Sequence, residues 1–184
     1  MAVLTLVVGG VRSGKSRWAE RLASAHARVT YLATGQAGDA EMVGRIAAHR
    51  QRRAREAPGW RTVEEAWEVP AALAAAGRAE GSGPEPCVLL DCLPLWLTNL
   101  LVGLPGRPAL DDAAVGRRVD ALLAAARAAA GRVIVVSAEV GCGIMPANAL
   151  ARRFGDLLGE ANQRLAADAA EVYACLAGLP LRVK

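Results

Sequence analysis

The sequence predicts an α/β fold: a mainly parallel sheet flanked by helices, with an antiparallel hairpin at the C-terminal end. Short apolar runs of strand length alternate with longer segments of helical periodicity along the 184 residues, which is typical of α/β folds. The first apolar run leads into a glycine-rich loop, Gly9–Ser16, which opens a helical segment. The last two apolar runs are short and close together. We expect one domain, long enough to bury a substantial core.

The first half of the chain is predicted to alternate strands with helices. Apolar and β-branched residues predict strands at 3–8, 29–33 and 60–63. A helix is expected at 15–27 behind the glycine-rich loop, and another at 39–56, where Asp39 is a residue type that caps helix N-termini. Alanine, the strongest helix former, dominates a third predicted helix at 69–79.

The second half continues the alternation. Strands are predicted at 87–91 and 133–137, and helices at 95–102, 111–130 and 148–169. Gly103–Pro108 is interpreted as a mobile surface loop, and Gly131 as the end of the helix before it. Residues 172–176 and 181–183 are predicted to form the closing hairpin. The apolar stripes that predict the two long helices are Val115, Val119, Leu122, Leu123 and Ala126, and then Leu150, Phe154, Leu157, Leu158, Ala161 and Leu165.

Composition excludes several classes of protein. No apolar stretch of about 18 residues is free of charges, so no membrane insertion is expected. The first apolar run belongs to the predicted fold and follows no basic segment, so no signal peptide is expected. Four cysteines (Cys87, Cys92, Cys142 and Cys175) lack C-x-x-C spacing, which favours reduced, mostly buried thiols in a cytoplasmic protein over a disulfide or zinc site. The net charge of +4 is mild, and a polyanionic small molecule accounts for it as well as a nucleic acid would.

The strongest motif is the loop itself, which fits G-x-x-x-x-G-K-[ST], the P-loop pattern. Its glycines let backbone N–H groups turn toward phosphate oxygens, and the following helix directs its positive dipole end at the same point. Lys15 is expected to reach the β- and γ-phosphates and Ser16 to ligate Mg²⁺. Among 22 basic residues only Lys15 and Lys184 are lysines. The candidate phosphate-binding residues are Gly9, Gly10, Arg12, Ser13, Gly14, Lys15 and Ser16. Residues 1–184 are therefore interpreted as a single P-loop nucleotide-binding domain.

Two acidic residues lie at or just beyond the C-terminal ends of predicted strands. Asp91 ends an apolar strand, where a carboxylate beside a P-loop holds Mg²⁺ directly or through water. Its alternative role is an ordinary strand-end turn residue. Glu139 follows the strand at 133–137 and is a candidate for positioning water, with a purely structural role as the alternative.

His49 is one of two histidines. Its spacing from Met42 and Ile46 is that of a core position on the predicted helix. Arg45 precedes it by one turn, however, and Arg50, Arg52 and Arg53 follow. Neighbouring cations favour the neutral imidazole, which is a nucleophile, and guanidinium groups suit phosphate oxygens. This arrangement fits nucleotidyl transfer through a phosphohistidine. His26 is interpreted as a helix-terminus residue. No aromatic residue interleaves with Arg50–Arg55, so nucleic-acid binding is not expected.

Motifs along nearly the whole chain resemble a known family, the bifunctional adenosylcobinamide kinase/adenosylcobinamide-phosphate guanylyltransferases of cobalamin biosynthesis. The P-loop alone has low specificity, but the P-loop followed by R-I-x-x-H and E-V-G-x-G-I-x-P is highly specific. The matching stretches are 9–17, 31–34, 39–42, Arg45-Ile46 with His49, 60–64, 91–93, 95–101, 139–141, Gly143-Ile144, Pro146 and Asn162-Gln163.

The resemblance implies two reactions. A nucleoside triphosphate, ATP or GTP, phosphorylates the aminopropanol arm of adenosylcobinamide, and GTP then donates GMP to that phosphate, giving adenosylcobinamide-GDP and pyrophosphate. The family's guanylylated histidine corresponds to His49. Glu64 and Asp91 join the expected nucleotide-binding residues, and Glu41, Arg45, Arg53 and Glu139 are further candidates. The family is similar to RecA-type P-loop folds and tends to form trimers, which implies a homo-oligomer.

Two positions depart from the family pattern. Ala138 stands where the family usually has Asn, and Pro94 stands where Thr is common. Two rival functions remain open at this point: a P-loop small-molecule kinase without transferase activity, and a RecA-like nucleotide-switch subunit that binds a partner.

Overall fold

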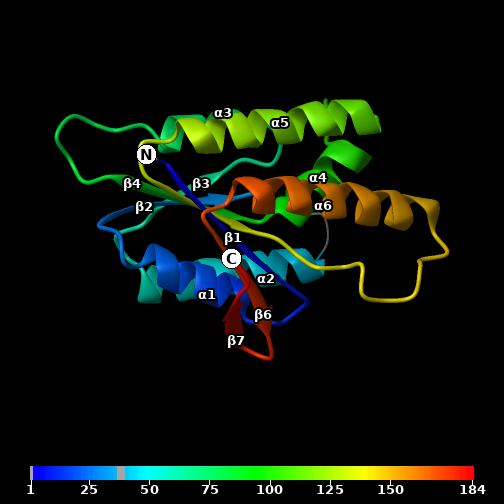
Figure 1. Ribbon diagram of the computed structural model, residues 1–184, viewed down its shortest axis with the longest axis horizontal. Coiled ribbons are helices and arrows are strands. Elements are labelled where there is room, and N and C mark those ends of the chain that lie inside the picture. The colour runs from blue at the N-terminus through cyan, green and yellow to red at the C-terminus, as the bar shows by residue number, and fades with distance from the viewer. Residues whose placement is uncertain (1, 37–39) are drawn as a thin grey trace.

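The computed structural model describes residues 2–36 and 40–184, with the side chains of residues 40–42, 45, 46, 49 and 52 outside the description. The predicted cap Asp39 also lies outside the described residues. One sheet runs through the molecule (Figure 1). Its strands are β1 (Val3–Gly9), β2 (Arg28–Ala33), β3 (Arg61–Glu64), β4 (Pro86–Asp91), β5 (Arg132–Val136), β6 (Glu171–Leu176) and β7 (Leu179–Arg182). The helices are α1 (Lys15–Ala23), α2 (Ala40–Glu56), α3 (Val69–Ala76), α4 (Leu93–Val102), α5 (Asp112–Ala128) and α6 (Ala149–Asp168).

The strand order is β3-β2-β4-β5-β1-β6-β7. Every neighbouring pair is parallel except β6 and β7, which pair antiparallel. The predicted fold class is therefore confirmed, including the closing hairpin. The first strand of the chain lies deep in the sheet, between β5 and β6. Because parallel strands end at the same edge, the residues that follow β1, β2, β4 and β5 gather there.

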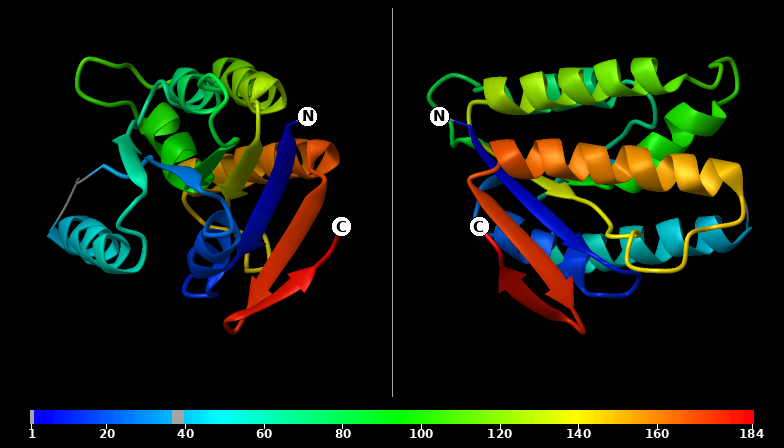
Figure 2. Two further views of the ribbon diagram at one scale, coloured as in Figure 1. Left: turned by 90° about the vertical axis from the view of Figure 1, so that its left-hand side faces the viewer. Right: turned by 45° about the vertical axis from the view of Figure 1, so that its right-hand side comes forward.

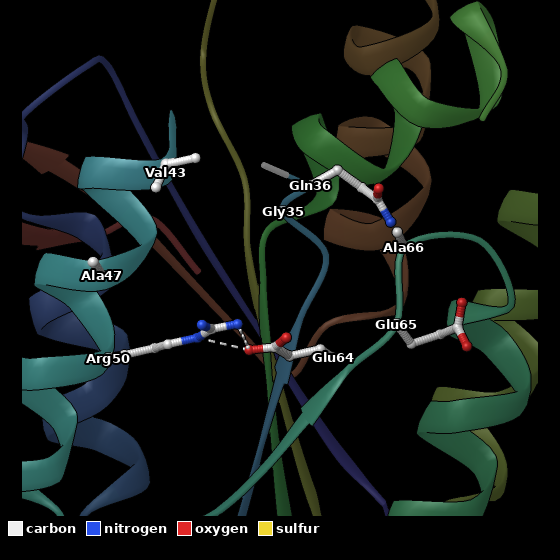
Figure 3. A pocket seen from close by; sticks show the side chains of 8 residues that line it. All are labelled: Gly35, Gln36, Val43, Ala47, Arg50, Glu64, Glu65 and Ala66. Carbon is white, nitrogen blue, oxygen red and sulfur yellow. Dashed lines mark hydrogen bonds and ion pairs between the residues drawn. The ribbon is translucent and has the colours of Figure 1, made fainter. Parts of the chain in front are cut away.

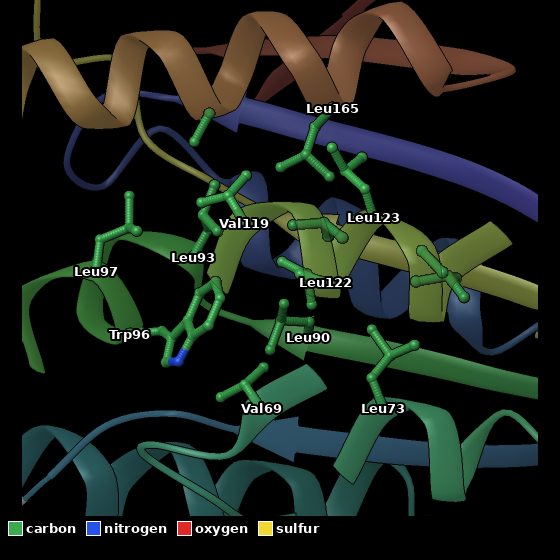
Figure 4. Packing of buried hydrophobic residues seen from close by; sticks show 14 of the residues in the cluster. Val69, Leu73, Leu90, Leu93, Trp96, Leu97, Val119, Leu122, Leu123 and Leu165 are labelled. Carbon is green, nitrogen blue, oxygen red and sulfur yellow. The ribbon is translucent and has the colours of Figure 1, made fainter. Parts of the chain in front are cut away.

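Helices cover both faces of the sheet (Figure 2). Helices α3, α4, α5 and α6 lie over one face, and α1 and α2 lie over the other. The larger core fills the first face, where Trp96 and Leu122 are completely buried against β4 and β5 (Figure 4). The Trp96 indole N–H donates to the carbonyl oxygen of Trp67 at 3.0 Å, so the buried polar atom of this side chain is satisfied. The smaller core packs α1 against Val7, Leu89 and Ile134.

Several predicted helix ends are wrong by a few residues. Helix α1 stops at Ala23 rather than at 27. Directly after Ala23, the Ser24 hydroxyl donates to the Arg21 carbonyl and competes with the helical bonds. Helix α3 stops at Ala76 rather than 79, because Gly77 turns the chain and its carbonyl accepts from Ala130. The Leu150 position of the last predicted stripe is 44% exposed, so the buried stripe of α6 begins beyond its first turn.

Gly131 does not end a helix, contrary to the sequence interpretation. Helix α5 stops at Ala128, and Ala129 is already extended. A Cβ at Gly131 would lie 2.1 Å from the Pro86 carbonyl oxygen, so glycine is required there by the close approach of β4 and β5. Gly103–Pro108 forms a closed turn, in which Leu104 and Arg107 exchange backbone hydrogen bonds of 2.9 and 2.8 Å. Pro94 lies in the first turn of α4, where the missing N–H costs no helical bond.

The structural description includes no helix that is both long enough and apolar enough to cross a membrane.

Candidate active site

The loop between β1 and α1 has the geometry that phosphate binding requires. Arg12 and Gly14 have φ angles of 57° and 89°, and Gly14 caps the N-terminus of α1. Left-handed residues at such a turn direct successive N–H groups into a common concavity. The first N–H groups of α1 point the same way, since they have no partner within the helix. The loop at residues 10–16 therefore has backbone angles that suit an anion nest, and the Ser13 N–H donates to the Gly10 carbonyl at 3.3 Å within it.

Lys15 lies over this loop, with its ammonium nitrogen 3.1 Å from the Gly10 carbonyl oxygen. Phosphate oxygens of a bound nucleotide offer stronger acceptors for that group than one carbonyl. Ser13 is 7% exposed, and its hydroxyl has no hydrogen-bond partner in the described part of the chain. A Cβ at Gly9 would lie 2.5 Å from the Ser13 hydroxyl oxygen and 2.7 Å from the Cys175 carbonyl oxygen. Only glycine fits at the first position of the loop.

The C-terminal hairpin braces the loop from outside. Strands β6 and β7 are joined by Ala177 and Gly178, whose φ angles of 52° and 84° are those of a two-residue hairpin turn. The Gly178 N–H donates to the Ser13 carbonyl at 3.0 Å. A Cβ at Gly14 would lie 3.0 Å from the Gly178 Cα. Sequence reasoning missed this contact: Ala-Gly marks a turn, but no sequence pattern says where the turn packs.

Asp91 ends β4 at the same edge of the sheet, separated from the P-loop strand by β5 alone. One carboxylate oxygen, Oδ2, accepts a hydrogen bond of 2.7 Å from the Tyr31 hydroxyl. Burial and the nearby Asp91 charge raise the pKa of Tyr31 well above its ordinary value, so the phenol stays protonated. The Asp91 carboxylate is thus presented to the site with a fixed donor on one oxygen.

Glu139 reaches this edge through its backbone, because its N–H donates to the Gly9 carbonyl at 3.4 Å. Its carboxylate Oε1 accepts from the Gly141 N–H at 2.9 Å, within its own loop. Beside it, Asn162 of α6 accepts from the Ser137 hydroxyl at 2.6 Å and donates to the Ala138 carbonyl at 3.0 Å. The backbone at the unusual Ala138 is therefore held by an amide from α6.

Buried polar groups hold the strand ends together behind the site. The Thr34 hydroxyl accepts from the Cys92 N–H at 2.9 Å and donates to the Cys92 carbonyl at 2.7 Å. The Asn99 amide of α4 donates to the carbonyls of Thr34 and Ala66 at 3.0 and 3.1 Å. Burial and the Asp91 charge raise the pKa of the Cys92 thiol to about 12, which keeps it from acting as a nucleophile. The sequence motifs contain these residues, but their pattern did not reveal this supporting role.

Helix α2 lies beside this edge and carries the candidate histidine. His49 is within the helix, one turn before Arg53, but its side chain and those of Glu41 and Arg45 lie outside the described residues. Arg53 is 8% exposed, and its guanidinium carbon is 3.8 Å from the centre of the Tyr31 ring. Its Nε has no partner among the atoms described. The stacked guanidinium anchors α2 to β2.

A pocket of about 320 Å³ opens between α2 and the ends of β2 and β3 (Figure 3). Arg50 of α2 and Glu64 of β3 point toward each other across it and form an ion pair, with Arg50 Nε 2.8 Å from Glu64 Oε1. Both side chains are about half exposed, so the pair contributes little to stability. The pocket lining is Gly35, Gln36, Val43, Ala47, Arg50, Glu64, Glu65 and Ala66.

The donor set near the P-loop fits a hard cation. The Ser16 hydroxyl and the Asp91 carboxylate are oxygen ligands of the kind Mg²⁺ prefers, with phosphate oxygens and water completing its shell. Where side chains are described, no three His, Cys, Asp or Glu residues form a metal-binding group. A P-loop cation needs no such group, because its substrate supplies ligands.

Comparisons with known proteins agree along nearly the whole chain. Residues 5–183 match the family model described as cobinamide kinase / cobinamide phosphate guanyltransferase. The chain is 47% identical over 180 residues to the bifunctional adenosylcobalamin biosynthesis protein CobP of Pseudomonas aeruginosa, covering 97% of this chain and 96% of that protein. It is 41% identical over 189 residues to the bifunctional adenosylcobalamin biosynthesis protein CobU of Salmonella typhimurium, covering 99% of this chain and 100% of that protein.

A solved structure of the ATP synthase subunit NeqB from Nanoarcheaum equitans resembles the fold, with a TM-score of 0.51 and 11% identity over 94% of this chain and 45% of that one.

Proposed function

We propose, because the chain belongs to the cobinamide kinase / cobinamide phosphate guanyltransferase family, that it catalyses both reactions of that description. It phosphorylates adenosylcobinamide with ATP or GTP, and then transfers GMP from GTP to the product. The observation that carries the proposal is the family match over residues 5–183, supported by a sheet edge that holds the P-loop and Asp91 and by the contact of α2, the helix that includes His49, with Tyr31 through Arg53. A phosphate cradle alone would support only the first reaction.

In the kinase step, the terminal hydroxyl of the aminopropanol arm attacks the γ-phosphorus. The bond from that phosphorus to the bridging oxygen breaks, the nucleoside diphosphate leaves, and the hydroxyl proton is released. Lys15 and the N–H groups of residues 10–16 hold the triphosphate in line and offset its charge. Ser16 and Asp91 would hold Mg²⁺, which neutralises phosphate charge when bound.

In the transferase step, a neutral imidazole nitrogen of His49 attacks the α-phosphorus of GTP, and pyrophosphate leaves. Protonation of the resulting phosphoramidate weakens its phosphorus–nitrogen bond. A phosphate oxygen of cobinamide phosphate then attacks the same phosphorus, which releases His49 and forms the diphosphate bridge. Arg45, on the turn before His49, is a candidate for holding the phosphate oxygens. Arg53, a further candidate from the sequence, has its guanidinium buried on the Tyr31 ring and is interpreted as a support for α2.

The pocket between α2 and β3 is proposed to receive the guanine base. Guanine presents two N–H donors on one edge, and a carboxylate such as Glu64 accepts both in parallel. Binding of the base would replace the Arg50 contact with Glu64. Arg50 would then be free to approach a phosphate.

The deciding experiment uses GTP labelled at the α-phosphorus, with Mg²⁺. We expect acid-labile, alkali-stable label on the protein, mapped to His49. His49→Ala abolishes this label and the formation of adenosylcobinamide-GDP, while phosphorylation of adenosylcobinamide persists. His26→Ala removes the other histidine and serves as the matched control.

Three outcomes bear on the proposal. If His49→Ala still forms adenosylcobinamide-GDP from the phosphorylated substrate, the covalent route is wrong. If neither protein forms it, the chain is a small-molecule kinase. If no corrinoid is turned over at all, a nucleotide-switch subunit is the better description.

We further propose a cytoplasmic homotrimer, on the family resemblance alone. Light scattering during size-exclusion chromatography measures the mass of the assembly, and a mass of one chain would refute the trimer.

A further inference from the structure

Three side chains form a continuous contact from helix α2 to the end of β4. The Arg53 guanidinium lies on the Tyr31 ring, 3.8 Å from its centre, and the Tyr31 hydroxyl donates to Asp91 at 2.7 Å. Arg53 is 8% exposed and Tyr31 only 3%. Both contacts are therefore shielded from water, and polar interactions are stronger in such a buried environment than in solvent.

The pairing of β2 with β4 dictates this meeting. Ala33 is in register with Asp91, and Tyr31 lies two residues earlier on β2. Residues two apart point to the same face of a sheet, which here is the face covered by α1 and α2. Tyr31 is long enough to reach forward along that face to the carboxylate, while its ring remains in place for α2 to rest on.

We propose that Tyr31 is a positioning residue that couples the seat of helix α2 to the orientation of the Asp91 carboxylate. Its hydroxyl bonds to Oδ2 and restricts rotation of the carboxylate, so the other oxygen, which Tyr31 does not occupy, is the one proposed to serve the phosphate cradle. Its ring supports Arg53, one turn beyond His49. A displacement of α2 therefore reaches the acid through one side chain. The inference rests on the proposed function for the roles of Asp91 and His49.

The coupling has a consequence for a two-reaction enzyme. The kinase step needs the acid beside the γ-phosphate, and the transferase step needs His49 beside the α-phosphate. Because Tyr31 contacts both, the position of α2 and the orientation of the Asp91 carboxylate depend on each other. Loss of the ring removes this dependence. Loss of the hydroxyl alone affects the acid and leaves the seat of α2 intact.

The test measures nucleotide binding as a function of Mg²⁺, without any corrinoid. Binding of a fluorescent GTP analogue is titrated with Mg²⁺ for the wild type, Tyr31→Phe, Asp91→Asn and the double variant. Tyr31→Phe removes one hydrogen bond to a charged acceptor, so the half-saturating Mg²⁺ concentration should rise about three- to tenfold. Tyr173→Phe, at the only other tyrosine, is the matched control and should leave it unchanged.

The double variant separates positioning from plain packing. If Tyr31 acts through Asp91, adding Tyr31→Phe to Asp91→Asn should change the Mg²⁺ dependence by less than about twofold. Equal effects in both backgrounds, or a wild-type response of Tyr31→Phe, would overturn the inference. So would an Asp91→Asn variant whose Mg²⁺ dependence matches that of the wild type.

A second variant tests the link to α2. Tyr31→Leu removes the ring that supports Arg53 and should slow labelling of the protein by α-labelled GTP about tenfold or more relative to Tyr31→Phe, since a displaced nucleophile loses much of its effective concentration. Circular dichroism spectra and unfolding midpoints confirm that each variant is folded. Equal labelling of the two variants would refute the link. The Mg²⁺ titration measures nucleotide binding and needs no turnover. It therefore tests the role of Tyr31 even if the protein proves inactive on corrinoids.

Discussion

The backbone N–H of Gly178 donates to the carbonyl of Ser13, and so the turn of the C-terminal hairpin is bonded directly to the phosphate-binding loop. This bond shows that the P-loop is supported from two sides: by α1, which it caps, and by β6–β7, which lies against it. A loop with both supports is pre-organised for its ligand, which lowers the entropic cost of binding.

Gly178→Ala should weaken nucleotide binding. Gly178 has a φ of 84°, where an added Cβ costs about 1–2 kcal/mol, and relief of that strain displaces the turn from Ser13. We expect the Kd for GTP to rise severalfold and the free energy of unfolding to fall by about 1–2 kcal/mol. Gly106→Ala is the control, because Gly106 has a φ of 75° in a turn with open space around it. An unchanged Kd in Gly178→Ala would show that the hairpin does not support the loop.

Lys15→Ala should depress both reactions, because both need the triphosphate held in place. Removing one preorganised donor from a site of developing charge costs about a hundredfold or more in rate. Steady-state assays of adenosylcobinamide phosphorylation and of GMP transfer measure the loss. Lys184→Ala removes the other lysine, whose ammonium donates to the carbonyls of Ala166 and Ala167 at the end of α6, and should leave both rates intact. Full kinase activity in Lys15→Ala would contradict a shared cradle.

Glu64→Gln should reduce the preference for guanine. We expect the wild type to bind GTP about tenfold more tightly than ITP, which lacks the 2-amino donor. The variant should bind the two nucleotides with nearly equal affinity, since an amide offers one acceptor in place of two. Calorimetric titration gives both values of Kd. Glu65→Gln is the neighbouring control, because Glu65 Oε1 instead accepts from the N–H groups of Trp67 and Glu68. A preference that survives in Glu64→Gln would place the base elsewhere.

His26 should make stability depend on pH. Burial, and then the Arg132 charge, lower the pKa of His26 below 6.5 in the folded protein. The unfolded chain therefore binds more protons, so this contribution is present above pH 6.5 and is lost as the pH falls toward the folded-state pKa. His26→Gln should show a smaller loss of unfolding free energy than the wild type between pH 7.5 and about pH 5 in denaturant titrations. Parallel curves for the two proteins would rule out the histidine as the cause.

The order of secondary structure could be predicted from the sequence because each element has a strong local signal. The P-loop is predicted by a motif of residues adjacent in the chain. Local hydrophobic patterns likewise predict β4 and α5. Helix ends were less predictable, since Ser24 and Gly77 end helices through contacts that the stripe pattern does not encode. Gly131 was misread for the same reason: the need for glycine comes from Pro86, on a different strand.

The candidate site was predictable only where one residue type at one position implied a role. Lys15 and Asp91 follow from such patterns, and the structure brings them to one edge of the sheet. The contacts among Thr34, Cys92 and Asn99 could not be predicted, because they join strand ends that only the folded sheet brings together. The hairpin contact at Ser13 belongs to the same kind, with the two partners separated by most of the chain.

The position of β1 between β5 and β6 also sets the order in which the protein can become functional during synthesis. The strand that precedes the P-loop is translated well before its partners, which are residues 132–136 and 171–175. The half of the sheet formed by β2, β3 and β4 can pair earlier, because its strands lie closer together along the chain. The phosphate cradle is thus completed only after β6 and β7 have been translated. A nascent chain that stalls before β6 contains the P-loop sequence but lacks the strand that pairs with β1 and the hairpin turn that bonds to Ser13.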